Sequence, residues 1–322
     1  MDTILISLAP GTLSPEQVAR VRETAPVGVP VVVTRDRDEI EAMIDGIEVA
    51  AGWFPADLLP QASNLRWYQQ WSAGADWLLR HPEAVEADFV LTNTSGIHAV
   101  PIAEHVLALL LAFGRELPRA LSAQDRHEWI PQRDHPRLFE LNGKTMVLIG
   151  VGAIGRRIAQ VARAVGMEVL GVRRDPTQTV PGVTSMWGPD ELLNLLPRAD
   201  VVVLTVPLTE ETRGMIGRTE LEAMKETATL VNVGRGGTVD EAALADGLRN
   251  GRIGRAALDV FDDEPLPQHA SLWDLENLIV TSHYAGVTPH YHERALDVFL
   301  DNLARYTAGE DLKNVVDKDL GY

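Results

Sequence analysis

Short apolar segments alternate with amphipathic segments along most of the chain, and this alternation predicts an α/β fold. In the second half, polar or glycine-rich turns bound each apolar segment, and segments with helical periodicity separate most of them. Strands that are apolar throughout are typical of a parallel sheet with helices on both faces. The strands expected in this half are residues 145–150, 168–172, 200–206, 229–233, 255–260 and 278–282.

The N-terminal third repeats the alternation less regularly and predicts a second, smaller α/β unit. Ser14, Pro15 and Gln17 fit a capping box with proline at the first helical position, which predicts a helix between the first two strands. A closing helix is expected over about residues 289–307, and it should cross back to this smaller unit. The strands expected here are residues 4–8, 29–34, 49–53, 65–69 and 89–91.

These patterns predict two domains, because 322 residues exceed what one ordinary hydrophobic core organises. The smaller domain should comprise residues 1–98 together with 288–322, and the larger domain residues 99–287. Residues 119–142 are rich in charge, proline and tryptophan and are only weakly periodic. This segment is either a linker or an arm that packs against a partner subunit.

Composition narrows the class of protein. A formal net charge of −17 argues against nucleic acid and anionic membranes as partners, because both attract basic surfaces. The longest apolar stretch, residues 99–113, contains Glu104 and His105 and is shorter than a membrane span. Residues 3–10 lack a basic beginning, so they are expected to form a strand rather than a signal peptide. With no cysteine for disulfides, the chain is expected to be cytoplasmic.

A glycine-rich turn follows the first strand of the larger domain. Gly150, Gly152 and Gly155 form the pattern G-x-G-x-x-G, and apolar residues continue after it at helical spacing. Such a turn binds the pyrophosphate of a dinucleotide, because the second glycine leaves room for the anion and the helix N-terminus offers free N–H groups. We therefore predict dinucleotide binding here, with Ala153 and Ile154 in the same turn. The alternative is a glycine-rich turn that binds nothing.

Arg235, Glu264 and His283 come soon after the fourth, fifth and sixth strands expected in the larger domain. Parallel strands bring their carboxyl ends to one edge of a sheet, which is where dinucleotide folds bind ligands. An arginine can bind a carboxylate through two hydrogen bonds, and a histidine can give a proton to an alkoxide near neutral pH. A carboxylate beside a histidine orients the ring and raises its pKa. These residue types together fit hydride transfer to the carbonyl carbon of a 2-oxo acid.

Each of these three residues also has a simpler interpretation. Arg235 could cap a helix, Glu264 could be a solvated loop carboxylate, and His283 could be a buried structural histidine. Their coincidence at one sheet edge, beside the glycine turn, favours the catalytic interpretation.

Several stretches resemble the D-isomer-specific 2-hydroxyacid dehydrogenase family. They include LIGVGAIGRRIA, MKETATLVNVGRGGTVDEAAL, AALDVFDDEPLP and LIVTSHYAG, and the similarity runs from about Ser72 to the C-terminus. The resemblance implies a Rossmann dinucleotide-binding domain inserted into a smaller flavodoxin-like α/β substrate domain. It also implies that Arg235 binds and polarises the substrate, that His283 is the general acid and base, and that Glu264 orients His283.

The resemblance further assigns residues to the cofactor and the substrate. Asp259 would meet the nicotinamide amide. The residues expected to line the cofactor cleft are Pro207, Thr212 and Val233. The backbone of Ala73, Gly74 and Ala75 would bind the substrate carboxylate. Because such proteins are commonly dimers, a homodimer through the arm at residues 119–142 is expected. No metal site is predicted.

The residues after the second strand of the larger domain bear on the choice of cofactor. An Asp there would accept a hydrogen bond from the ribose 2′-hydroxyl of NAD, but this chain has Arg173 and Arg174. Arginines can instead pair with a 2′-phosphate, so we predict a preference for NADP(H), with NAD(H) as the alternative cofactor. Asp175 could still serve NAD if the strand ends later, and the arginines could also be merely solvated.

Two bulky residues fall where substrate-lining side chains are expected. Trp53 follows the third N-terminal strand and Tyr284 follows His283, so they either select the shape of the substrate or are core aromatics. The predicted activity is reduction of a small 2-oxo acid, such as glyoxylate or hydroxypyruvate, to a D-2-hydroxy acid. The sequence leaves open which acid is used and in which direction. The alternative from another class is a dinucleotide-sensing, corepressor-like binding protein of the same fold.

Overall fold

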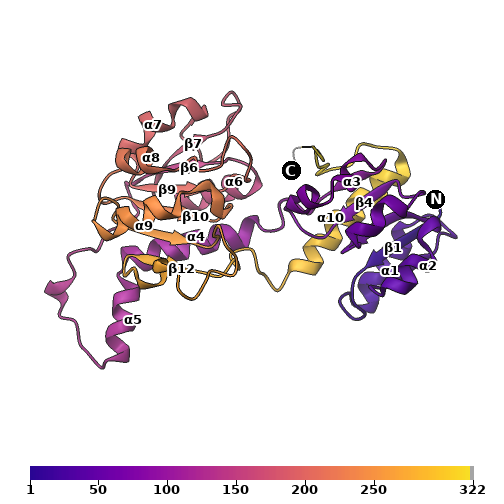
Figure 1. Ribbon diagram of the computed structural model, residues 1–322, viewed down its shortest axis with the longest axis horizontal. Helices are drawn as coiled ribbons and strands as arrows, with labels where there is room; N and C mark the ends of the chain where they lie inside the picture. The colour runs from indigo at the N-terminus through magenta and orange to yellow at the C-terminus, as the bar shows by residue number, and fades with distance from the viewer. Residues whose placement is uncertain (320–322) are drawn as a thin grey trace. The chain divides into compact units, whose positions relative to one another are not determined.

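The computed structural model describes residues 1–319, apart from the side chains of Asp76 and Leu79, and the chain forms two compact units (Figure 1). Unit 1 comprises Met1–Ile97 and Thr288–Tyr322, and unit 2 comprises His98–Val287. Each unit contains one sheet of parallel strands with apolar clusters on both of its faces. The α/β fold class is therefore confirmed.

Unit 2 contains a seven-stranded sheet in the order β12-β11-β10-β9-β6-β7-β8. The chain enters the middle of the sheet at β6, runs outward to β8, and then builds β9 to β12 on the other side of β6. This is the doubly wound Rossmann order, and its switch point lies between β6 and β9. The strands are β6 (Thr145–Ile149), β7 (Glu168–Val172), β8 (Ser185–Trp187), β9 (Val201–Leu204), β10 (Thr229–Asn232), β11 (Arg255–Leu258) and β12 (Leu278–Val280).

All six strands expected in unit 2 are present, and β8 is a strand that the hydrophobic pattern does not predict. It consists of three half-buried residues at the edge of the sheet, so it lacks the apolar run of the inner strands. One face of the sheet packs against α4 and α6 around Val106 and Ile158, and the other packs against α7, α8 and α9 around Leu221 and Leu244. The helices are α4 (Ala99–Gly114), α5 (Leu117–Asp125), α6 (Ala153–Ala164), α7 (Leu192–Leu195), α8 (Arg218–Ala223) and α9 (Glu241–Arg249).

Unit 1 contains a five-stranded sheet in the flavodoxin-like order β2-β1-β3-β4-β5. Ile4 and Ile6 of β1 pack in the cluster that includes α1 and α10, whereas Leu5 packs in the cluster on the opposite face. The strands are β1 (Thr3–Ser7), β2 (Val31–Val33), β3 (Ile47–Gly52), β4 (Trp67–Gln70) and β5 (Val90–Thr92). The helices are α1 (Pro15–Thr24), α2 (Arg37–Ala42), α3 (Pro82–Glu86) and α10 (Tyr291–Ala308).

Unit 1 contains both the predicted capping box and the predicted closing helix. Ser14 and Gln17 form the capping box at the start of α1, with Pro15 at the first helical position. The C-terminal helix α10 packs beside α1, so the chain returns to unit 1 after unit 2 is complete.

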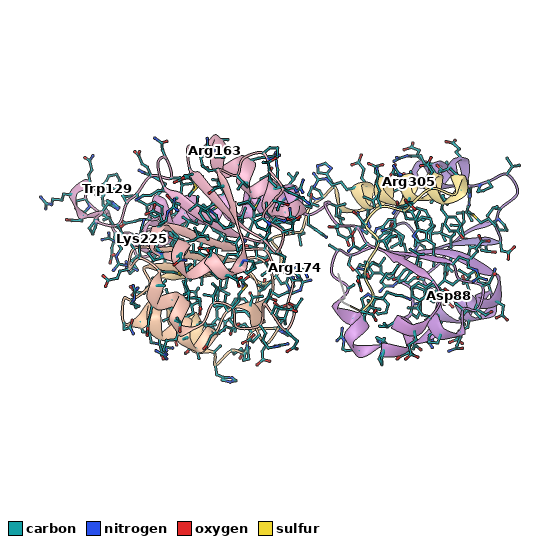
Figure 2. All side chains as sticks on the ribbon, turned by 90° about the horizontal axis from the view of Figure 1, so that it is seen from above. Asp88, Trp129, Arg163, Arg174, Lys225 and Arg305 are labelled. Carbon is teal, nitrogen blue, oxygen red and sulfur yellow. The ribbon has the colours of Figure 1, made fainter. Side chains whose placement is uncertain are left out.

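The segment at residues 119–142 includes most of α5, which extends from the body of unit 2 (Figure 1). Glu116 is buried at its base and accepts hydrogen bonds from His135 Nδ1 at 2.8 Å and from the Arg137 N–H at 3.0 Å. Trp129 is 92% exposed and projects from unit 2 (Figure 2). Within residues 1–319, no helix is both long and apolar enough to cross a membrane.

Candidate active site

The glycine turn joins β6 to α6, and two of its glycines are required by the protein itself. Gly150 has a φ of +93°, and a Cβ there would lie 2.8 Å from Thr205 Oγ1. A Cβ on Gly155 would lie 2.1 Å from the Gly150 carbonyl oxygen, so only glycine lets α6 pack this closely on the strand end. A Cβ on Gly152, in contrast, would meet no protein atom within 4 Å. Nothing in the chain itself requires glycine at position 152.

The loops after β9, β10 and β11 come together beside this turn through further close backbone contacts. A Cβ on Gly234 would lie 2.7 Å from the Val206 carbonyl oxygen, and one on Gly236 would lie 2.0 Å from the Phe261 carbonyl carbon. Thr212 Oγ1 donates to the Pro207 carbonyl at 2.7 Å and so closes the loop after β9. The carboxyl edge of the sheet is thus a packed set of loops in which glycines permit backbone-to-backbone contact.

Arg235 follows β10 and is half-buried in this set of loops. Its carbonyl oxygen accepts hydrogen bonds from Asn232 Nδ2 at 2.9 Å and from Thr238 Oγ1 at 2.6 Å. Its guanidinium donates to the Gly234 carbonyl at 2.8 Å. The backbone of Arg235 is therefore held by buried side chains on either side of it. Val233, the first residue after β10, is itself buried.

His283 and Glu264 form a direct pair at the ends of β12 and β11. His283 Nδ1 lies 2.6 Å from Glu264 Oε2, and the other carboxylate oxygen accepts the Phe261 N–H at 3.0 Å. An ionised carboxylate can only accept, so the histidine carries its hydrogen on Nδ1 in this pair. Nε2 is then the ring nitrogen left for other chemistry, and half of the His283 side chain is exposed. His283 also has a φ of +53°, a left-handed backbone that its turn must support.

Asp259 supports that turn with both its backbone and its side chain. The Asp259 carbonyl accepts the His283 N–H at 2.8 Å. Its carboxylate, which is almost fully buried, accepts the N–H groups of Tyr284 at 3.1 Å and Ala285 at 3.0 Å, and the Thr281 hydroxyl at 2.6 Å. The resemblance assigned Asp259 to the nicotinamide; its contacts within the chain also make it the group that fixes the backbone around His283.

His105 of α4 completes this network. Its Nε2 lies 3.1 Å from Thr281 Oγ1, and its ring makes an edge contact with Tyr284 at a centroid distance of 5.4 Å. Burial lowers the pKa of His105, which favours the neutral ring. Because the Thr281 hydroxyl donates to Asp259, His105 Nε2–H is the donor to Thr281. The sequence signal for this residue was the polar pair at 104–105 inside an apolar helix.

The region expected to select the cofactor lies just after β7. This strand ends at Val172, so Arg173 is the first residue beyond it. Arg173 Nη1 donates to Gln178 Oε1 at 3.2 Å, and Arg174 is exposed on the surface of unit 2 (Figure 2). The Asp175 carboxylate accepts hydrogen bonds from the N–H and hydroxyl of Thr177, and the Thr177 hydroxyl is the main cause of its lowered pKa. Asp175 is therefore engaged in its own turn.

Unit 1 contains the other residues expected to meet substrate. Ala73, Gly74 and Ala75 form the loop after β4, and Trp53 follows β3. Trp53 is 42% exposed and Tyr284, in unit 2, is 48% exposed, so neither belongs to a core. Interpretation of these two side chains as core aromatics is therefore wrong.

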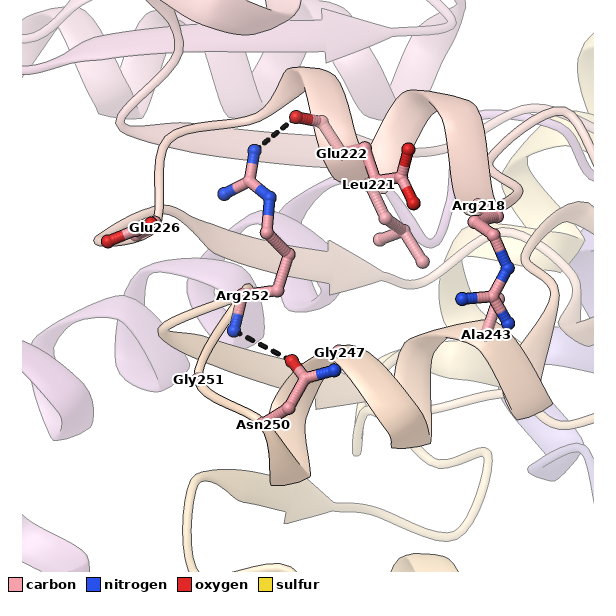
Figure 3. A pocket seen from close by; sticks show the side chains of 9 residues that line it. All are labelled: Arg218, Leu221, Glu222, Glu226, Ala243, Gly247, Asn250, Gly251 and Arg252. Carbon is pink, nitrogen blue, oxygen red and sulfur yellow. Dashed lines mark hydrogen bonds between the residues drawn. The ribbon is translucent and has the colours of Figure 1, made fainter.

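A cavity of about 430 Å³ lies elsewhere in unit 2, between α8 and α9 (Figure 3). None of the expected site residues lines it. Its lining mixes Arg218 and Arg252 with Glu222 and Glu226. Arg252 is occupied with the main-chain carbonyls at the end of α8, including that of Met224 at 2.6 Å.

Comparison with known proteins gives one family. Residues 107–285 match the model of the D-isomer specific 2-hydroxyacid dehydrogenase, NAD binding domain. The chain is 35% identical to a glyoxylate reductase of Aeropyrum pernix over 82% of this chain and 80% of that protein. It is 34% identical to a D-3-phosphoglycerate dehydrogenase of Methanocaldococcus jannaschii over 81% of this chain, but spans only 49% of that protein.

A solved structure resembles the whole chain. It is that of an NADPH-dependent glyoxylate/hydroxypyruvate reductase from Sinorhizobium meliloti in complex with NADP and sulfate. The TM-score is 0.83, at 27% identity, and the match covers 100% of both chains.

Proposed function

Because the chain belongs to the D-isomer specific 2-hydroxyacid dehydrogenase family of NAD(P)-dependent enzymes, we propose that it reduces a small 2-oxo acid to a D-2-hydroxy acid. The observation that carries this proposal is the pair of His283 Nδ1 and Glu264 Oε2 at 2.6 Å, at the same sheet edge as Arg235 and the glycine turn. The relatives described above are named as enzymes, so the corepressor-like alternative finds no support among them.

The glycine turn fits the pyrophosphate of a nicotinamide cofactor. The space beside Gly152 and the N–H groups of Ala153 and Ile154 at the start of α6 suit a bound anion. We assign the cofactor contacts to this turn and to Pro207, Thr212, Val233 and Asp259. A bound reduced cofactor supplies the hydride.

The side chains of unit 2 then supply binding and proton transfer. Arg235 pairs with the carboxylate of the acid and polarises its carbonyl group. His283 donates Nδ1–H to Glu264, which orients the ring and leaves Nε2 as the nitrogen that faces the substrate. As the new C–H bond forms, Nε2–H gives its proton to the carbonyl oxygen, and the alcohol results. In the reverse direction the same nitrogen accepts the hydroxyl proton.

NADP(H) is the preferred cofactor in this proposal. Arg173 and Arg174 follow β7 directly, and the carboxylate of Asp175 is already engaged by Thr177. The Sinorhizobium reductase, which is NADPH-dependent, supports the same preference. NAD(H) remains the alternative cofactor.

The arm supports a homodimer. Leu121, Trp129 and Leu138 of the arm are 61%, 92% and 40% exposed, which is unusual for large apolar side chains gathered on one segment. We propose that residues 119–142 pack against a second copy of the chain. A cytoplasmic location stays a prediction from the sequence.

Replacement of His283 tests the assignment. We expect the purified wild-type protein to oxidise NADPH in the presence of glyoxylate or hydroxypyruvate, and His283→Ala to lose at least about 100-fold in kcat, because general acid catalysis contributes about 10²–10⁴. His269→Ala, which removes an exposed histidine of the same unit, should behave like wild type. Equal turnover by His283→Ala and wild type would contradict the role of His283.

A further inference from the structure

The loop after β4 has no glycine signature, yet its peptide groups are held in one orientation. The Ser72 carbonyl accepts Gln70 Nε2 at 3.0 Å, the Ala73 carbonyl accepts Asn93 Nδ2 at 2.8 Å, and the Gly74 carbonyl accepts Gln70 Nε2 at 2.8 Å. Three consecutive carbonyls are therefore bound by the amide groups of two side chains of unit 1.

This arrangement determines where the neighbouring N–H groups point. In a trans peptide the C=O of one residue and the N–H of the next lie in one plane and point in opposite directions. Tying the carbonyls of residues 72, 73 and 74 to Gln70 and Asn93 therefore directs the N–H groups of residues 73, 74 and 75 away from those side chains. Among the described residues, none accepts a hydrogen bond from these three N–H groups.

The two amide side chains are themselves fixed. Gln70 is 2% exposed and Asn93 is 8% exposed. Gln70 Oε1 accepts the indole N–H of Trp77 at 2.8 Å, and Asn93 Oδ1 accepts the Ser95 N–H at 2.9 Å. With the oxygen of each amide already used, its NH₂ group must face the loop. The amides cannot flip without losing these bonds.

We propose that Gln70 and Asn93 are positioning residues that pre-organise the N–H groups of residues 73–75 to bind the carboxylate of the substrate. The inference rests on the proposed function, because that function supplies the carboxylate. Successive N–H groups turned to one side form an anion-binding concavity. Pre-organisation reduces the cost of ordering the loop when the acid binds. The NH₂ groups of Gln70 and Asn93 bind carbonyl groups of this loop, so both residues act through its backbone.

Asn93→Asp is the main test, because it keeps the size of the side chain and its bond from Ser95 but replaces the donor to Ala73 by an oxygen. We expect the KM for glyoxylate to rise about tenfold or more, while the KM for NADPH stays within about twofold of wild type. Trp77→Phe, which frees the Gln70 amide, should raise the same KM by a smaller factor. Gln61→Glu, an exposed change of the same chemistry in unit 1, is the matched control and should have no effect.

A second measurement does not depend on turnover. Oxalate serves as an unreactive dicarboxylate probe. In wild type it should shift the NMR signals of the backbone amides of residues 73–75. In folded Asn93→Asp the same shift should require about tenfold more oxalate. Unchanged oxalate affinity and unchanged KM in a folded variant would overturn the inference. Wild type that binds oxalate at these amides but reduces no 2-oxo acid would instead contradict the proposed function while leaving the positioning role supported.

Discussion

Two loops of this protein are proposed to bind anions, and they are built in different ways. In unit 2 the turn between β6 and α6 depends on glycines, because its backbone conformation and its close packing exclude any side chain at Gly150 and Gly155. In unit 1 the loop after β4 depends on buried amides, because Gln70 and Asn93 hold its carbonyls. The first loop is shaped by the absence of side chains and the second by their hydrogen bonds.

The difference explains why only the first loop has a sequence motif of its own, whereas the second was assigned through the family resemblance alone. A steric requirement for glycine leaves a fixed pattern in the sequence, since no other residue can substitute. A hydrogen bond from a glutamine or asparagine leaves no such pattern, because amide residues are common and their partners are set by the fold. The turn that carries His283 belongs to the second kind, since the Asp259 carboxylate holds it.

The largest effect is expected at Gly155. A methyl group there would lie 2.1 Å from the Gly150 carbonyl oxygen, so α6 must move away from β6. We expect Gly155→Ala to lower the free energy of unfolding by about 1–3 kcal/mol and to weaken NADPH binding. Gly152→Ala is the matched comparison: it should change stability by no more than about 1 kcal/mol but raise the KM for NADPH by about tenfold or more. Thermal melts measure the change in stability, and NADPH titrations measure the change in cofactor binding. Equal melting points for Gly155→Ala and Gly152→Ala would contradict the different structural roles of the two glycines.

A loss of stability without a loss of cofactor binding is expected at Thr281. This change tests whether side chains hold the turn around His283, as they hold the loop in unit 1. Thr281→Val removes the hydroxyl that lies between His105 and Asp259, and it leaves a buried acceptor short of one donor. We expect a loss of about 1–3 kcal/mol in stability and a fall in kcat of roughly tenfold, with the KM for NADPH little changed. Thr281→Ser keeps the hydroxyl and should restore most of the activity. If Thr281→Val melts earlier but keeps its kcat, the network stabilises the unit without positioning His283.

The fold could be predicted from the sequence because its strands are buried on both faces. Continuous apolar runs such as β6 and β9 stand out from the polar turns around them, and each of the expected strands is present. The missed strand, β8, is short and lies at the edge of the sheet, where burial imposes no apolar pattern. The capping box of α1 could also be predicted, because it is a local interaction between residues close in sequence.

The site residues that could be predicted from the sequence are those that come soon after a strand of the parallel sheet. Glu264 and His283 could be paired because parallel neighbouring strands must end at the same edge, and they do lie in contact. The contacts of His105 and Gln70 could not be predicted, because each joins elements far apart in the chain or depends on a loop conformation that no local pattern encodes. The sequence placed His105 only within a mostly apolar stretch, and its hydrogen bond to Thr281 became visible only in three dimensions.

The smallest effect is expected at Arg173, and it concerns specificity alone. The glycine turn binds a pyrophosphate that NAD and NADP share, so discrimination between them must come from side chains near the ribose. Arg173 is only partly buried, so water screens its charge and its effect should be moderate. We expect Arg173→Asp to lower the ratio of kcat/KM for NADPH to kcat/KM for NADH by roughly tenfold, or about 1.4 kcal/mol. Arg198→Asp, the same change at an exposed position of unit 2, controls for net charge and should leave the ratio unaltered. The melting points of both variants should equal that of wild type, because neither arginine holds the backbone of the turn. An unchanged kcat/KM ratio in Arg173→Asp would show that the glycine turn and its neighbours select the cofactor without this arginine.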